Sequence, residues 1–184
     1  MLNAAVLWSH RAPRLDDLDV RCVVERRPPR GCDRETFDAE TAAMLRRFDV
    51  DTVVLVGYLF VITEPLLRPF RGRIINVHDA DLTLRNASGG PRYPGLHATR
   101  DAIVAGECET RSSVHIVTPE LDAGPVIARS ESFPVAPFVH EAVARGEHDI
   151  VRAYAYAQRE WMIRSSWPAL IASALARLSM EAVA

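Results

Sequence analysis

Four short apolar runs in the first half of the sequence constrain the fold most strongly. Each is rich in β-branched residues and bounded by polar or turn-forming stretches, and they cover residues 4–8, 20–24, 53–56 and 74–77. Runs of this kind are typical of strands buried on both faces. Residues 36–48, between the second and third runs, repeat apolar side chains at helical spacing behind a cap at Asp33 or Thr36. This alternation predicts an α/β fold with an open, Rossmann-like, mostly parallel sheet flanked by helices.

The middle of the chain continues this pattern. A short turn of helix is expected at residues 63–65, and a loop marked by glycine and proline at residues 86–94. Residues 97–105 are then expected to form another helix. Two extended segments follow, at residues 112–117 and 126–133, and we expect them to pair as a long hairpin.

The C-terminal part has a helical pattern. Apolar residues keep steps of three and four from Phe138 through Gly146 to Trp161, which predicts one amphipathic helix, and Pro168 is expected to break it before a second helix. We predict a single domain over residues 1–184, with an α/β catalytic core in residues 1–135 and a C-terminal helical segment in residues 136–184.

Composition excludes several mechanisms. The chain has 184 residues, with 22 basic and 24 acidic side chains for a net charge of −2, and every basic residue is arginine. Without lysine, the chain offers neither a Schiff-base lysine nor the lysine of a phosphate-binding P-loop. The near-neutral charge, with arginines scattered among acids, argues against a nucleic-acid partner.

We expect a cytoplasmic protein with no membrane partner. Three cysteines without C-x-x-C spacing, at Cys22, Cys32 and Cys108, favour a reducing compartment over a disulfide framework. The first eight residues lack the pattern of a signal peptide, and the longest apolar-rich run, residues 53–62, is too short to span a bilayer.

Polar residues at strand ends are candidates for chemistry. Asn76 and His78 alternate onto one face at the end of the fourth run, where parallel sheets bind ligands, and Ser113 and His115 share a face of a later strand. Asp122 lies in a turn that can bring its carboxylate over the same edge. An ordinary surface pair and a turn aspartate are the alternative interpretation.

A metal site is a further alternative. It would be formed by His78, His97, His115 and Asp122, although no H-x-x-x-H or H-E-x-x-H spacing supports it.

Five segments together resemble the folate-dependent formyltransferases, in particular those that act on glycinamide ribonucleotide. They are residues 51–58, 72–78, 93–98, 113–117 and 120–127. The combination of Asn-x-His at 76–78 with Leu-Asp-x-Gly-Pro at 121–125 is the most specific part, and the similarity extends over residues 53–135.

The resemblance implies transfer of a formyl group from 10-formyltetrahydrofolate, as co-substrate, to the amine of a small-molecule acceptor, with phosphoribosylglycinamide as the reference. No metal is implied. Asn76 and a protonated His78 would stabilise the tetrahedral oxyanion, and Asp122 would keep His78 charged and relay the amine proton through a water. Ser113 would help to hold that water.

The resemblance also implies where the donor lies. The pterin would occupy an apolar slot formed by two segments, with the residues Gly57, Tyr58, Leu59, Phe60, Val61, Ile62, Val117 and Leu121.

The sequence departs from the family on the acceptor side. Residues 9–13 replace the glycine loop that cradles a phosphate, and the stretch from Asp79 to Tyr93 is longer than usual. An anionic acceptor would therefore be held by arginine, and the candidates are Arg11, Arg14, Arg85 and Arg92.

Several hypotheses remain open at this point. An amino sugar and a modified amino acid are alternative acceptors. A hydrolase of the same donor, in which water replaces the amine, is a second alternative, and a non-enzymatic folate-binding or partner-binding domain is a third. A homodimer formed through the C-terminal helices is a further hypothesis, based on their aromatic content.

Overall fold

The computed structural model describes residues 2–10 and 20–181. The strands are β1 (Ala4–Trp8), β2 (Cys22–Glu25), β3 (Thr52–Leu55), β4 (Ile74–His78), β5 (Glu109–Thr110), β6 (Ser113–Ile116), β7 (Val126–Arg129) and β8 (Phe133–Pro134). The helices are α1 (Arg34–Arg47), α2 (Glu64–Leu67), the 3₁₀ turn η1 (Arg68–Phe70), α3 (Ala98–Val104), α4 (Pro137–Ala144) and α5 (His148–Glu181). The four predicted strands and the helix capped by Asp33 are confirmed, with boundaries within about two residues.

The main sheet has six strands in the order β2-β1-β3-β4-β6-β7. The first four are parallel, whereas β6 runs antiparallel to both β4 and β7. The expectation of a mostly parallel α/β sheet is therefore confirmed, and so is the hairpin of β6 and β7. The prediction that all four strands are buried on both faces is wrong for β2. It is an edge strand with a neighbour on one side only, and its residues alternate between half-buried and exposed.

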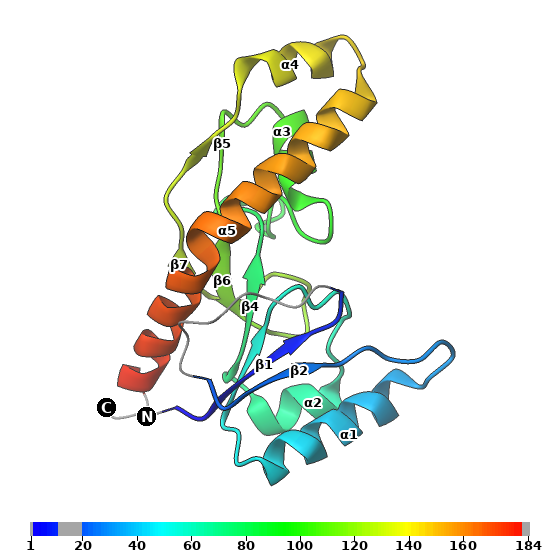
Figure 1. Cartoon of the computed structure of the whole chain (residues 1–184), viewed down its shortest axis with the longest axis vertical. Helices are drawn as coiled ribbons and strands as arrows, with labels where there is room; N and C mark the ends of the chain where they lie inside the picture. Colours follow the sequence, from blue (N-terminus) through cyan, green and yellow to red (C-terminus); the bar gives the residue numbers. More distant parts are fainter. Residues whose placement is uncertain (1, 11–19, 182–184) are drawn as a thin grey trace.

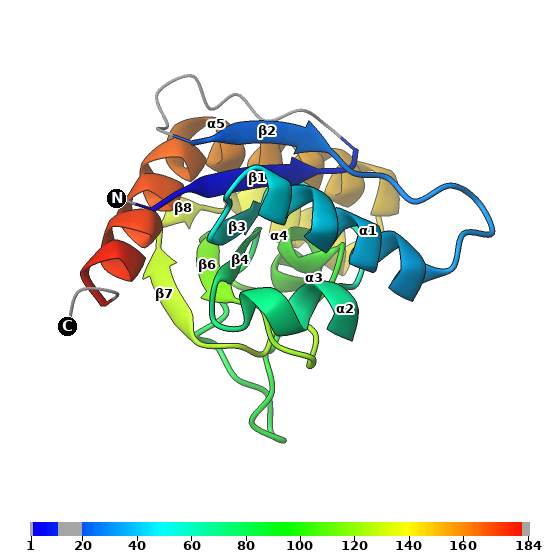
Figure 2. The same cartoon turned by 90° about the horizontal axis from the view of Figure 1, so that it is seen from below.

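Helices cover both faces of the sheet (Figures 1 and 2). Val54 and Ile75 share one apolar cluster with Ile171 of α5, whereas the neighbouring Val53 packs on the other face with Leu45 of α1 and the side chains of α2. This separation follows from the alternation of side chains along a strand. The N-terminal half of α5 extends beyond the sheet and packs against α3 and α4 (Figure 1).

The apolar spacing predicted one helix over residues 138–161. This prediction is wrong, because the chain forms two helices there, α4 and α5. Gly146 has φ +69°, the left-handed conformation that glycine adopts most easily, and it ends α4. The Gly146 N–H donates to the carbonyl of Val143, and the Glu147 N–H donates to that of Ala142. These two bonds form a Schellman motif, which satisfies the last carbonyls of the helix before α5 begins.

Pro168 does not break the C-terminal helix either, because α5 continues through it to Glu181. Proline inside a helix costs about 3 kcal/mol. The turns that follow bury Leu170, Ile171 and Leu178 against the sheet, and each such side chain contributes about 1.5–3 kcal/mol. Burial after the proline therefore outweighs its cost.

Candidate active site

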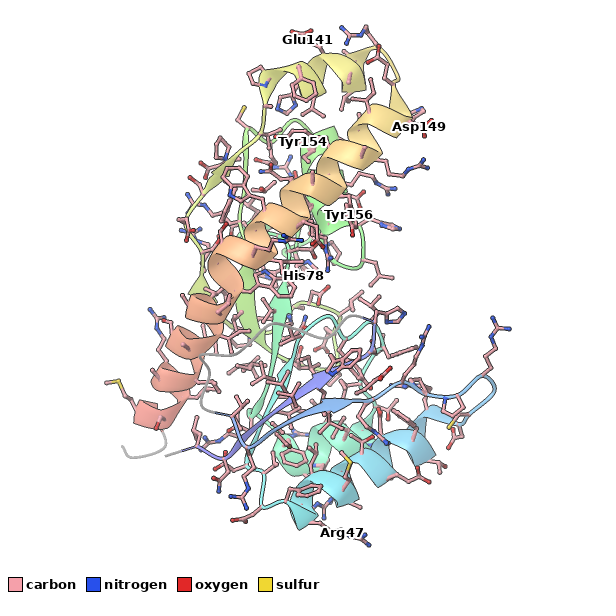
Figure 3. The ribbon with its side chains drawn as sticks, viewed as in Figure 1. Arg47, His78, Glu141, Asp149, Tyr154 and Tyr156 are labelled. Atoms are coloured by element: carbon pink, nitrogen blue, oxygen red, sulfur yellow. The ribbon has the colours of Figure 1, made fainter. Side chains whose placement is uncertain are left out.

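The end of β4 brings four polar side chains onto one face of the sheet. The antiparallel register of β4 and β6 pairs Asn76 with His115 and His78 with Ser113, so all four side chains lie on the same side. Figure 3 shows His78 in the middle of the molecule, at the end of β4 and next to α5. The side-chain alternation expected from the sequence is thus present at the carboxyl end of a parallel strand, where α/β sheets bind ligands.

Asp122 reaches this group from the loop between β6 and β7. Its Oδ2 lies 3.6 Å from Nδ1 of His78, and its Oδ1 lies 3.5 Å from Nε2 of His115. The carboxylate also accepts a hydrogen bond of 2.8 Å from the backbone N–H of Gly95. Asp122 has φ +52°, a conformation that aspartate and asparagine tolerate better than most residues. The left-handed turn thus aims the carboxylate at both histidines.

The surroundings of Asp122 keep its carboxylate ionised. Burial would raise the pKa of Asp122, but the hydrogen bond from His115, the charge of His78 and the Gly95 N–H outweigh it and lower the pKa to about 2. At neutral pH this side chain is therefore a proton acceptor and a source of negative charge beside the two imidazoles.

His78 has a hydrogen-bond partner at its other nitrogen. Its Nε2–H donates to the carbonyl of Tyr93 at 2.9 Å, which places a proton on Nε2 and leaves Nδ1 facing Asp122. A protonated His78 therefore has an acceptor beside each nitrogen.

His115 belongs to the same cluster, although the sequence analysis gave it no role beyond a shared face with Ser113 and the alternative metal site. Its Nδ1–H donates to the carbonyl of Ile116 at 3.1 Å, and its Nε2 lies 3.2 Å from Nδ2 of Asn76. That Nε2 can accept from Asn76 when it is neutral and donate to Asp122 when it is protonated. The signal was present in the sequence, since His115 shares the face of Ser113 on β6.

Ser113 lies elsewhere in the network. Its hydroxyl donates to the carbonyl of Ala80 at 2.9 Å and accepts from the N–H of Leu82 at 3.1 Å. These bonds fix the loop after His78, and no described hydrogen bond joins Ser113 to Asp122. In the structure Ser113 supports the loop rather than contacting the carboxylate.

A cavity of about 300 Å³, called here the apolar cavity, opens beside this cluster. Asn76, His78, His115 and Asp122 line it together with all eight residues predicted for the donor: Gly57, Tyr58, Leu59, Phe60, Val61, Ile62, Val117 and Leu121. Four large apolar side chains on this cavity are more than a third exposed: Leu59, Val61, Leu96 and Leu121. A concave apolar surface with a few convergent polar groups is typical of a small-molecule site.

The predicted acceptor arginines are not brought together here. Arg85 is exposed on the loop after β4, and Arg92 forms an ion pair of 3.1 Å with Glu107. Neither lines the apolar cavity. Arg11 and Arg14 lie outside the described residues.

An ion pair that the sequence did not reveal joins this site to α5. The Arg159 Nε–H donates to Oδ2 of Asp79 at 2.7 Å, and the hydroxyl of Thr99 donates to the Asp79 carbonyl at 2.8 Å. Asp79 follows His78 directly, so the pair ties the carboxyl end of β4 to the helix. The Arg159 guanidinium also lies over the ring of Trp167, at 5.9 Å from its centroid.

Residues 2–10 and 20–181 contain neither a cluster of metal ligands nor a membrane-spanning helix. No group of three or more His, Cys, Asp or Glu side chains there is arranged to hold a metal ion. Within the same residues, none of the helices combines the length and apolar character needed to cross a membrane.

The formyl transferase family model matches residues 19–164, which is most of the chain. The chain belongs to the formyl transferase family. Its relatives include the phosphoribosylglycinamide formyltransferase of Escherichia coli, 37% identical over 98 residues that cover 53% of this chain and 42% of that protein. A trifunctional purine biosynthetic protein adenosine-3 from Drosophila pseudoobscura pseudoobscura is 30% identical over 79% of this chain and 10% of that protein. The matched region thus spans less than half the length of these relatives.

Solved structures agree with the family fold. Glycinamide ribonucleotide transformylase 1 from Symbiobacterium toebii has a TM-score of 0.60 and 26% identity, covering 88% of this chain and 86% of that chain. A formyltetrahydrofolate deformylase from Pseudomonas syringae pv. tomato has a TM-score of 0.61 at 22% identity, covering 86% of this chain and 60% of that chain. The second likeness shows the fold alone.

Proposed function

We propose that the protein transfers a formyl group from 10-formyltetrahydrofolate to the amine of a small-molecule acceptor, with phosphoribosylglycinamide as the reference acceptor. The observation that carries this proposal is the convergence of Asn76, His78 and an ionised Asp122 on one apolar cavity. A hydrogen-bond donor, a titratable imidazole and a proton acceptor are the groups that formyl transfer to an amine requires.

The apolar cavity suits the folate part of the donor. A pterin is flat and carries polar edges, and this cavity combines the apolar side chains of residues 57–62 with the backbone of the same segment. Val117 and Leu121 supply apolar contacts from the loop after β6. Folate bound there would place its formyl group beside the cluster around His78.

Asn76 and His78 would stabilise charge as the acceptor amine attacks the formyl carbon. The amide N–H of Asn76 and the Nδ1–H of His78 donate to the carbonyl oxygen, which gains negative charge. The Nδ1–H is the one available, because Nε2–H donates to Tyr93 and the Asp122 carboxylate, at 3.6 Å from Nδ1, lies beyond hydrogen-bond distance. Removal of one such donor typically costs about 2.7–4 kcal/mol of transition-state stabilisation.

Asp122 would act in two ways. Its negative charge stabilises the imidazolium of His78, and it can accept the proton that leaves the attacking amine, directly or through a water. The same proton can then pass to N10 of the donor as the bond between N10 and the formyl carbon breaks, which releases tetrahydrofolate and the formylated amine. His115 lies against both side chains from the neighbouring strand, with its Nε2 at 3.5 Å from Asp122 and 3.2 Å from Asn76, so it would position Asp122 when protonated and Asn76 when neutral.

Release of tetrahydrofolate tests the proposal. The purified protein is incubated with 10-formyltetrahydrofolate, with and without phosphoribosylglycinamide, an amino sugar or a modified amino acid. Release that depends on one amine, and that is lost in His78→Ala, is the expected result. Release without any amine would instead identify a hydrolase. No turnover under any condition, with folate binding retained, would refute the transferase assignment.

A further inference from the structure

A second cavity, of about 400 Å³, adjoins the apolar cavity and is called here the arginine cavity. The two share Gly57, Leu59, Asp79, Leu96 and Arg159 in their linings. They are therefore two halves of one cleft, and the boundary between them lies at Asp79, the residue after His78. Figure 3 shows Tyr156, which lines the arginine cavity, on the half of α5 that passes beyond the end of β4.

Within the described part of the chain, three guanidinium groups line this second half. Arg100 comes from α3, whereas Arg152 and Arg159 come from α5, where a spacing of seven residues places them on one face two turns apart. Tyr156 lies between them on the same face. Asp79 is the one carboxylate among the described lining residues, and it is already paired with Arg159. The lining therefore carries an excess of positive charge.

Two of these arginines are free to exchange partners. Arg100 contacts the adjacent Asp101 at 3.1 Å, and Arg152 contacts Asp149 at 2.9 Å. In both pairs the two side chains are more than 40% exposed, and ion pairs of that kind contribute about 0–1 kcal/mol. A ligand anion that reaches both guanidinium groups at once can replace these weak contacts with charge-assisted hydrogen bonds.

We propose that the arginine cavity binds the anionic end of the amine acceptor, a phosphate or carboxylate group, and so directs its amine toward His78 and Asp122. This inference rests on the proposed formyl transfer. Arginine suits the task because its planar fork binds phosphate and carboxylate oxygens in pairs, and the chain has no lysine. The acceptor class is thus an anionic amine held by α3 and α5.

Two single variants test the proposal. Arg100→Gln and Arg152→Gln remove one positive charge each from side chains that are 43% and 76% exposed, so we expect folding to be preserved. Arg164→Gln is the matched control, because Arg164 is also an exposed arginine of α5 and lines neither cavity. A hydrogen bond to a charged group contributes about 1.5–3 kcal/mol, so we expect the KM for phosphoribosylglycinamide to rise about tenfold or more. The KM for the formyl donor and the kcat should stay near the wild-type values.

Two results would overturn the proposal. One is a rise in the KM of the donor instead of the acceptor, which would assign the arginines to the acidic tail of the folate. The other is an equal effect in Arg164→Gln, which would indicate long-range charge rather than contact.

Direct binding separates this inference from the proposed reaction. Isothermal titration of the wild-type protein with phosphoribosylglycinamide, without any formyl donor, needs no turnover. Binding that is weakened in Arg100→Gln and Arg152→Gln would support the anion site even if no formyl transfer were observed. Absence of binding in the wild-type protein, together with formylation of an amine that has no anionic group, such as glycinamide, would overturn the anion site and leave the reaction intact.

Competition identifies the anion. Displacement by inorganic phosphate supports a phosphate acceptor, and displacement by acetate supports a carboxylate acceptor. The test uses each anion at up to 50-fold excess over the bound amine, which covers a difference in binding free energy of about 2 kcal/mol. Failure of both anions to compete over this range would overturn the proposal.

Discussion

Replacing Asp122 with asparagine removes the negative charge from the centre of the site at nearly constant volume. The backbone tolerates the change, because asparagine also adopts the left-handed conformation seen at this position, where φ is +52°. An alanine variant would add backbone strain to the loss of charge, so the two effects could not be separated. Asp122→Asn therefore isolates the effect of the carboxylate on the two histidines.

The expected loss of stability follows from the pKa. The pKa of Asp122 is lowered from an ordinary 3.8 to about 2, since its polar partners outweigh burial. A difference of almost two units corresponds to about 2 kcal/mol. A lowered pKa in the folded state means that this stabilisation is complete above about pH 4 and is lost as the pH falls toward 2. The variant lacks it at every pH.

The expected loss of activity is larger. Without its carboxylate the site has no acceptor for the amine proton and no charge to stabilise the imidazolium of His78. General acid–base groups contribute about 10²- to 10⁴-fold, so kcat/KM for formyl transfer should fall by a factor in that range.

Urea denaturation at pH 7 and pH 3, and initial rates of tetrahydrofolate release at pH 7, measure both effects. The gap in unfolding free energy between wild type and Asp122→Asn should narrow by about 1 kcal/mol between pH 7 and pH 3. Glu120→Gln, an exposed change in the same loop, should change neither quantity. A gap that is independent of pH, or a kcat/KM within about threefold of wild type, would refute this account of the site.

Three further predictions concern the framework of the site. Gly124→Ala places a methyl group on a backbone carbonyl oxygen of β6, so it should destabilise the protein by about 3 kcal/mol or more in urea denaturation and reduce activity. Asp79→Asn removes the charged partner of the half-buried Arg159, and we expect a loss of about 2 kcal/mol, most of it absent when Arg159→Gln is already present in a double-mutant cycle. Trp167→Phe loses the 2.9 Å hydrogen bond to the buried hydroxyl of Ser112, which should lower the free energy of unfolding by about 1–3 kcal/mol.

The sheet could be predicted from the sequence because burial on both faces leaves a local signal. β1 and β3 appear as unbroken apolar runs for that reason, and the polar Asn76 and His78 stand out at the end of the next run. The C-terminal helices were predicted less well. Steps of three and four continue across Gly146, so apolar spacing alone hides the end of α4, and the burial that carries α5 past Pro168 depends on a sheet far away in sequence.

The site residues also differ in whether the local sequence predicts them or whether they depend on contacts between distant segments. Asn76 and His78 follow from strand alternation, whereas the turn placed Asp122 only near the same edge. Its role beside His78 came from the resemblance to a family, since a turn aspartate carries no local sign of its partners. His115 was visible on the face of β6, but its contacts with Asn76 and Asp122 depend on the register of two strands. The Asp79–Arg159 pair joins residues 80 positions apart, and no spacing rule predicts such a contact.

Helix α5 makes the site depend on the core. Its C-terminal half is fixed on the sheet by Ile171 and its neighbours, and its N-terminal half carries Arg159 to Asp79, the residue after His78. A helix is stiff over this length, so a rotation or shift at the buried end moves the charged end as well. The same helix supplies Arg152 to the arginine cavity. Packing of α5 on the sheet therefore sets the distance between the proposed anion site and the imidazole of His78.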